Sequence, residues 1–104
     1  MIRAEYNRVD LSLLVRGHAQ SAPKGEDLIC AAASILAFTA EGVLQNEEAH
    51  FMPRISRRNG EFRIVCQPKE GQVARCRQIF DTIFTGFEIL ANEYPDYVRV
   101  TKEE

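Results

Sequence analysis

An Asn-Gly pair at residues 59 and 60 is the feature that most constrains how this chain folds. Alternating side chains flank it, in residues 51–58 before it and in residues 61–67 after it. A two-residue type I′ turn needs positive φ at both central positions, and Asn-Gly is the pair that tolerates this best. Pro53 cannot donate a hydrogen bond to a sheet ladder. We therefore expect it either in an edge strand or at the start of a strand. The pattern therefore predicts an antiparallel hairpin.

Two longer stretches follow the helical period of 3.6 residues instead. In the first, residues 27–46, apolar residues recur on one face: Ile29, Ala32, Ala33, Leu36, Ala40 and Val43. Leu28, Ile35 and Phe38 widen this face, so we expect the helix to be largely buried. The second stretch opens at Gly71, ends before Pro95 and carries one continuous apolar stripe: Val73, Cys76, Phe80, Ile83, Phe87, Leu90 and Tyr94.

The remaining strands come from the two ends of the chain. Residues 2–7 and 11–16 alternate between apolar and polar side chains across a turn at residues 7–10, which predicts a second hairpin. Residues 97–101 are expected to form a short final strand, and residues 17–26, with two glycines and a proline, a loop. The predicted order is ββαββαβ. It indicates a two-layer α+β fold of one domain, residues 1–104, with a mainly antiparallel sheet packed against two helices.

The composition limits the class of protein. A chain of 104 residues can bury a core without disulfides or a structural metal, and an odd count of 3 cysteines argues against a disulfide scaffold. The first residues lack the apolar core of a signal peptide, and the nearly apolar run 28–38 is shorter than a membrane span of roughly 18 residues. We therefore expect a cytoplasmic protein. A formal net charge of -2 argues against binding to nucleic acid through overall basicity and leaves a local basic patch open. We expect no membrane partner and no direct binding to nucleic acid.

His18 and Cys30 are the residues best placed for chemistry. We expect Cys30 in the first turn of a helix, where the positive helix end and free N–H groups stabilise a thiolate and a developing oxyanion. His18 lies in the preceding loop, and an imidazole there can take the thiol proton and later protonate a leaving amine. However, an isolated cysteine in an alanine-rich helix is most often a small buried residue, and a loop histidine is usually idle. Spacing alone leaves both interpretations open.

Two short motifs are more specific. Gly17-His18-Ala19 and Gly25-Glu26-Asp27-Leu28-Ile29-Cys30-Ala31-Ala32-Ala33-Ser34 resemble the G-H-A and G-x-D-[IVL]-[IVL]-C-A-[AG]-x-S segments of the ribosomal-processing cysteine protease (Prp) family. The order of the motifs and the twelve residues from His18 to Cys30 also agree, as do the chain length and the predicted order of elements. The resemblance covers essentially the whole chain. It implies a homodimeric cysteine endopeptidase that removes an N-terminal extension from the precursor of a large-subunit ribosomal protein.

Carried over to this chain, the resemblance implies Cys30 as nucleophile and His18 as general base. Asp27 and Ser34 match motif positions: Asp27 either orients His18 or caps the helix, and Ser34 either positions substrate or water or bonds back to its own helix. Gly17 and Gly25 bracket the loop, and we expect them to be hinges that let a bound peptide order the loop and assemble the dyad. We expect no cofactor. We also expect no metal, because His50 has no companion at ligand spacing.

Other functions stay open. The chain is alternatively a non-enzymatic, ribosome-associated dimeric interaction domain, or the same protease acting on a phage or mobile-element protein. The alanine-rich first helix favours a dimer, because one sheet cannot cover all of its apolar surface. Cys66 and Cys76 are expected in the core. Four arginines near the hairpin either contact RNA or an acidic partner, or simply keep a sheet edge soluble: Arg54, Arg57, Arg58 and Arg63.

Overall fold

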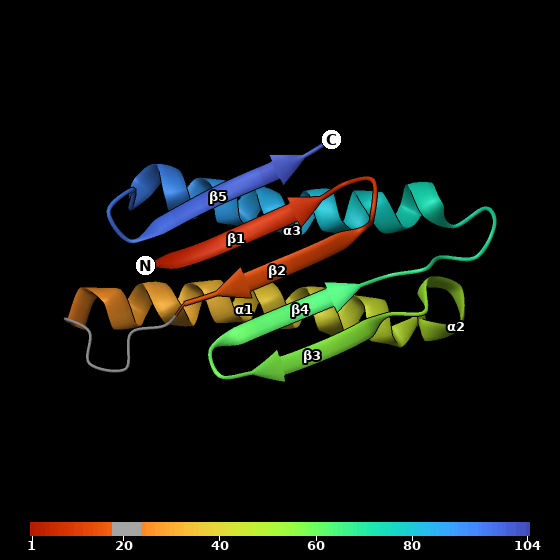
Figure 1. The fold of residues 1–104 in the computed structure, drawn as a ribbon, viewed down its shortest axis with the longest axis horizontal. Helices are drawn as coiled ribbons and strands as arrows, with labels where there is room; N and C mark the ends of the chain where they lie inside the picture. Colours follow the sequence, from red (N-terminus) through yellow and green to blue (C-terminus); the bar gives the residue numbers. More distant parts are fainter. Residues whose placement is uncertain (18–23) are drawn as a thin grey trace.

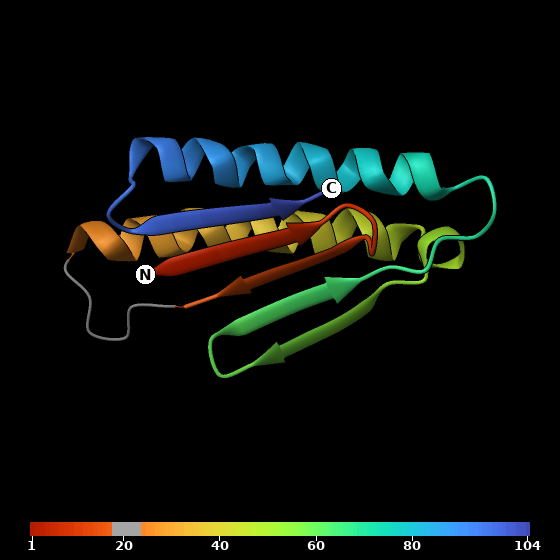
Figure 2. The same ribbon diagram turned by 45° about the horizontal axis from the view of Figure 1, so that its top comes forward.

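The computed structural model describes residues 1–17 and 24–104, with side chains at all of these except residues 24–27. The elements follow in the order β1 (Ile2–Asn7), β2 (Ser12–Arg16), α1 (Lys24–Asn46), α2 (Glu48–Phe51), β3 (Arg54–Arg58), β4 (Glu61–Val65), α3 (Val73–Glu93) and β5 (Val98–Glu103). The strands form one 5-stranded sheet in the order β3-β4-β2-β1-β5. Figure 1 shows the sheet in front of α1 and α3, and Figure 2 shows both helices on the same side of it. The predicted two-layer α+β fold is confirmed, with the short helix α2 in addition.

The Asn-Gly turn forms as predicted. Asn59 and Gly60 have φ of 41° and 79°, and β3 and β4 pair antiparallel on either side, with Arg58 opposite Glu61. β3 is an edge strand, as expected from the proline just before it. The prediction that this strand begins at Phe51 is wrong. Residues 48–51 form α2 instead, because Phe51 turns inward and is buried in the core at 0% exposure.

The strand β1 lies between two neighbours that run in opposite senses. It pairs antiparallel with β2 and parallel with β5, so the chain must cross behind the sheet through α3 to reach β5. Side chains alternate along these strands between the helix-covered face and the open face. The covered face supplies the sheet's part of the core: Ile2, Ala4, Tyr6, Leu13, Val15, Phe62, Ile64 and Val98.

The helix α3 follows its predicted period, but it begins at Val73 instead of Gly71, and Tyr94 lies just outside it. It ends at Glu93, before Pro95, and buries one stripe of large side chains: Cys76, Phe80, Ile83, Phe84 and Phe87. Tyr6 of β1 packs on this stripe, with its ring centroid 5.7 Å from that of Phe80 and 5.2 Å from that of Phe84. These contacts anchor α3 to the centre of the sheet.

The helix α1 differs from its prediction in two ways. It begins at Lys24, so the expected loop over residues 17–26 is wrong at its C-terminal end and Gly25 lies in the first helical turn. It is also not largely buried, because Leu28 is 72% exposed and Ile35 63% exposed. The buried face consists mostly of small residues: Ile29, Ala33, Ala37, Ala40 and Leu44. Small side chains let the helix lie close to α3, and the larger residues on its other faces are left outside.

The same helix is long and apolar enough to cross a membrane by length and composition. The stretch Leu28–Asn46 has a mean hydropathy of 1.7, because α1 continues past Phe38 with Glu41 as its one further charged residue. Core helices of soluble proteins also meet this criterion. Here one side of α1 packs into the core, and the other side is exposed.

Candidate active site

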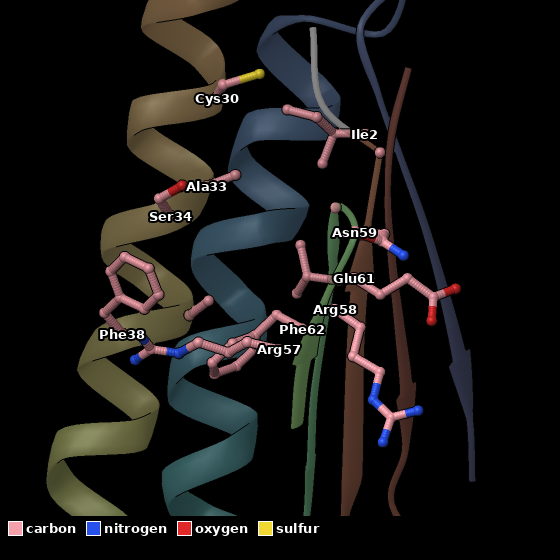
Figure 3. A pocket seen from close by; sticks show the side chains of 14 residues that line it. Ile2, Cys30, Ala33, Ser34, Phe38, Arg57, Arg58, Asn59, Glu61 and Phe62 are labelled. Carbon is pink, nitrogen blue, oxygen red and sulfur yellow. The ribbon is translucent and has the colours of Figure 1, made fainter. Parts of the chain in front are cut away.

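A pocket opens between α1 and the sheet, next to the Asn59-Gly60 turn. Its volume is about 380 Å³, within the usual range for ligand pockets. The α1 wall carries Cys30, Ser34 and Phe38 on successive turns, and much of the opposite wall is apolar: Ile2, Val15 and Phe62. Figure 3 shows the Cys30 sulfur pointing away from the helix, toward the side where Ile2 lies. A thiol therefore faces a mostly apolar cavity that is open to solvent.

The three thiols of the chain have different surroundings. Cys30 is half-buried at the pocket, whereas Cys66 and Cys76 are 3% and 0% exposed, which confirms the expectation that these two belong to the core. The two buried thiols also contact each other. A hydrogen bond with Cys76, together with burial, raises the pKa of the Cys66 thiol, so that it stays protonated at neutral pH. Cys30 is the thiol that a substrate can reach.

The position of Cys30 within α1 corrects one expectation. Because α1 begins at Lys24, Cys30 is its seventh residue and lies in the second turn. Only the first four N–H groups of a helix are free, and the electrostatic effect of the helix end falls off within the first turn. The prediction that backbone N–H groups around Cys30 stabilise an oxyanion is therefore wrong.

The structure describes only some of the other residues that were predicted for the site. His18 lies outside the described residues, and Asp27 is in α1 with its side chain undescribed, so their roles stay predictions. Ser34 lines the pocket one turn after Cys30 and is exposed. Among the described residues, no partner accepts or donates a hydrogen bond at its hydroxyl, which leaves this group available to a ligand. Gly25 lies in α1 rather than in a loop, and its role as a hinge also stays a prediction.

Gly17 fixes the chain where it approaches the pocket. Its φ is +94°, and a Cβ at this position would lie 2.1 Å from the carbonyl oxygen of Met1. Its N–H donates to the carbonyl oxygen of Gly60 at 3.1 Å. Only glycine suits this position, because it alone combines the positive φ with so close an approach of two backbone segments. Gly17 thus ties the end of β2 to the β3–β4 turn beside the pocket.

Arg57, which the sequence places only among the hairpin arginines, forms a further part of the pocket. Its guanidinium lies over the Phe38 ring, 4.5 Å from the centroid, and forms an ion pair with Glu41 of α1. Phe38 and Phe62 pack edge to face, with centroids 6.0 Å apart. The signal was the alternation of β3, which places Arg57 opposite the inward-facing Phe62. Arg57 therefore closes one end of the pocket instead of belonging to a solvated edge.

Nothing in the described part of the chain looks like a metal centre. No group of three or more His, Cys, Asp or Glu side chains there could hold an ion. His50 lies 3.3 Å from Glu47, with which it forms an exposed contact. The candidate site therefore depends on the thiol and on its surroundings.

Three solved structures share this fold over nearly the whole chain. The essential ribosomal processing protease Prp from S. aureus, in complex with a covalently linked product peptide, is 21% identical with a TM-score of 0.80, covering 99% of this chain and 100% of that one. The same protease with a substrate peptide is 20% identical with a TM-score of 0.80 and the same coverage. SMU.848 from Streptococcus mutans is 21% identical with a TM-score of 0.76, covering 99% and 94%.

Sequence comparisons match this chain to a protein family but to no individual curated protein. No curated protein matches this chain. The family described as cysteine protease Prp matches it over residues 1–99. That match includes the pocket, the accessible thiol at Cys30 and the whole sheet up to the first residues of β5. The chain therefore belongs to the cysteine protease family Prp.

Proposed function

We propose that this protein is a cysteine endopeptidase that removes the N-terminal extension of a large-subunit ribosomal protein precursor in the cytoplasm, with Cys30 as nucleophile and His18 as general base. One observation carries the proposal: Cys30 is the accessible thiol of the three, and it faces a pocket in a chain of a cysteine protease family. Two structures with the same fold hold a product or a substrate peptide, which supports an extended peptide as ligand.

The proposed reaction follows from the chemistry of a thiol and an imidazole. His18 takes the proton of Cys30, and the thiolate attacks the carbonyl carbon of the scissile peptide bond. The C–N bond of the tetrahedral intermediate breaks as the imidazolium gives its proton to the leaving amine. An acyl-enzyme thioester remains. Water then attacks the thioester carbonyl carbon while His18 takes a proton from the water. The C–S bond breaks, the imidazolium returns its proton to the thiolate, and the product leaves with a free carboxyl group.

The apolar lining of the pocket favours an apolar side chain of the peptide, bound next to the scissile peptide bond. Its floor and walls near Cys30 include Ile2, Val15 and Phe62. Burial of one large apolar side chain contributes roughly 1.5–3 kcal/mol. Such a contact would hold the scissile bond over the thiol, while Arg57 at the far end limits the depth of the pocket.

Loss of the nucleophile tests the proposal directly. Purified wild type is incubated with a peptide that spans the predicted junction of the extension, and cleavage is followed by mass spectrometry. We expect Cys30→Ala to abolish cleavage while its thermal melting stays unchanged. Gln45→Ala is the control on the same helix outside the pocket, and we expect it to retain the wild-type activity. Equal turnover by wild type and Cys30→Ala would eliminate Cys30 as nucleophile and favour an interaction domain that is not an enzyme.

The identity of the substrate needs a separate measurement. A host lysate is treated with wild type or with Cys30→Ala, and new protein N-termini are sequenced. New ends at a single site in a large-subunit ribosomal protein support the proposed substrate. New ends confined to phage or mobile-element proteins would show that the protein is a protease with a different substrate.

The outward face of α1 supports a dimer. Leu28, Ile35 and Val43 lie along one stripe and are 72%, 63% and 38% exposed, which is unusual for a helix of a monomeric domain. We propose that the same stripe of a second copy covers them. Sedimentation at low micromolar concentration is expected to give a dimer for wild type and a monomer for Ile35→Glu. Gln45→Glu places the same charge on an exposed part of the same helix away from the stripe, and should leave the dimer intact. Only monomer in the wild type would overturn this part of the proposal.

A further inference from the structure

The face of the sheet that the helices leave open carries a row of arginines. At one level across the strands, the outward side chains in sheet order are Arg58, Glu61, Arg16, Arg3 and Arg99. All of them are exposed, and Figure 1 looks onto this face. Neighbouring strands lie about 4.8 Å apart, so the row extends over about 19 Å. One end of it adjoins the pocket, where Figure 3 shows Arg58 and Glu61 pointing away from α1.

The open face is basic although the chain as a whole is acidic. Its outward positions hold six arginines and three glutamates, a formal charge of +3: Arg3, Arg16, Arg54, Arg58, Arg63 and Arg99, with Glu5, Glu61 and Glu103. The formal net charge of the chain is -2, which leaves -5 for all other positions. Among the described residues, Arg16 is the one arginine of these six that has an ion-pair partner, Glu5 at 3.0 Å. The folded chain thus separates its charges between two sides.

The arginine row opposes folding. Arg3 lies directly opposite Arg16 on one side and Arg99 on the other. Like charges at directly opposed positions of neighbouring strands destabilise a sheet. A polyanion that neutralises the row would remove this repulsion on binding.

We propose that the arginine row binds the phosphate backbone of double-helical RNA. A guanidinium offers two parallel N–H donors to a phosphate, and every basic residue at the outward positions of the sheet is an arginine. The outward positions of the described strands hold no aromatic residue, so unpaired bases find nothing to stack on. The apolar residues there are Leu14 and Val65, both half-buried, so a protein partner finds no large anchor. What remains is contact with a regular backbone, independent of sequence.

This inference does not depend on the proposed protease substrate. It differs from the expectation that the chain does not bind nucleic acid. That expectation used the net charge of the whole chain, which does not show that one face of the sheet is basic. Binding would hold RNA on the reverse side of the sheet, at the end that adjoins the pocket. A substrate protein assembled on RNA would then be brought to the enzyme without any contact between the RNA and the thiol.

The test compares two triple variants that remove the same charge. One changes the open face, Arg3→Gln with Arg63→Gln and Arg99→Gln. The control changes the rest of the surface, Lys69→Gln with Arg75→Gln and Lys102→Gln. Binding to a fluorescent RNA duplex of mixed sequence is measured by anisotropy at about 50 and about 200 mM salt, with polyglutamate as competitor. Both variants are checked for thermal melting and for cleavage of the test peptide.

We expect wild type and the control to bind the duplex equally, and the open-face variant to bind at least tenfold more weakly. Its slope of log affinity against log salt should be less steep by about 0.9 for each phosphate that the variant no longer neutralises. The open-face variant should melt at a higher temperature in low salt and cleave the test peptide as wild type does. No binding by the wild type, or an equal reduction in both variants, would overturn the proposal. So would displacement of the duplex by polyglutamate at equal charge concentration, which would identify an acidic protein as the partner.

Discussion

The two long helices α1 and α3 are nearly equal in length but place their large apolar residues on opposite sides. α3 turns Phe80, Phe84 and Phe87 into the core. α1 buries mainly alanines and leaves Leu28 and Ile35 in solvent, with Cys30 and Phe38 at the pocket. The difference indicates that α3 mainly fills the core, whereas α1 lines the pocket that contains Cys30. Substitutions of the same kind in the two helices should therefore have different effects.

Matched phenylalanine truncations should give the largest difference. Phe84 of α3 is 1% exposed, and Phe84→Ala is expected to lower the free energy of unfolding by about 3–5 kcal/mol. Phe38 of α1 is 46% exposed, so Phe38→Ala should lower it by about 1 kcal/mol at most. Urea unfolding followed by circular dichroism measures both. Phe38→Ala should instead slow peptide cleavage, because Arg57 loses the ring on which it lies.

The comparison would fail if both truncations destabilised the protein alike. It would also fail if Phe38→Ala cleaved the peptide at the wild-type rate, because Phe38 would then be an idle surface residue. Each variant is assayed for cleavage well below its own unfolding midpoint, so that loss of fold is not mistaken for loss of binding.

Glycine-to-alanine substitutions in the two helices should differ less in their effect on the free energy of unfolding. Gly42 of α1 has nothing within 4 Å of an added Cβ, so Gly42→Ala should stabilise the protein by about 0.5–1 kcal/mol through helix propensity. At Gly86 of α3, an added Cβ would lie 2.5 Å from Leu36 Cδ2 of α1. Leu36 must move, and its displacement should cancel the gain. Thermal unfolding of both variants tests this, and equal gains would show that the contact between the helices is loose at Gly86.

The contrast between the helices also explains what the sequence could predict. In α3, polar residues separate the apolar ones, so periodicity identifies most of the buried stripe, but it omits the buried Phe84 and includes the exposed Val73 and Tyr94. In α1, the run from Leu28 to Phe38 is apolar on nearly every face, and periodicity cannot choose between its large and its small residues. Packing makes that choice, because alanines occupy the middle of the face on which α1 lies close to α3. The expectation of a largely buried helix failed for this reason.

The candidate site was predictable to a similar degree. Motif and spacing identify Cys30, and the structure adds the accessible pocket around it. Arg57 belongs to the pocket because of a cross-strand register and a ring on a distant helix, which no local pattern contains. The start of α1 is likewise set by the fold, and it moves Cys30 from the first turn to the second. Local chemistry is thus visible in the sequence, while the walls of the site are not.

The smallest expected effect concerns how α3 is tied to β1. Asp81 accepts hydrogen bonds from Arg8 Nε at 3.0 Å and from Tyr6 Oη at 2.7 Å. The Arg8 guanidinium, and then the Tyr6 hydroxyl, hold the pKa of Asp81 below its ordinary value of 3.8. A carboxyl whose pKa is lowered by folding stabilises the protein at pH values above its unfolded pKa. That stability disappears as the pH falls through the lower, folded pKa.

Asp81→Asn should therefore melt at a lower temperature than wild type near neutral pH. The gap should begin to close as the pH falls below the ordinary value of 3.8 and should vanish once Asp81 is protonated in the folded wild type. Asp96→Asn, an exposed acid with no ion pair in the described part of the chain, should follow wild type at every pH. A gap for Asp81→Asn that does not change with pH would show that shape, and not charge, joins α3 to β1.

The ion pair that ties α1 to the sheet, Glu41 with Arg57, lies beside the pocket instead, so breaking it should alter cleavage as well as stability.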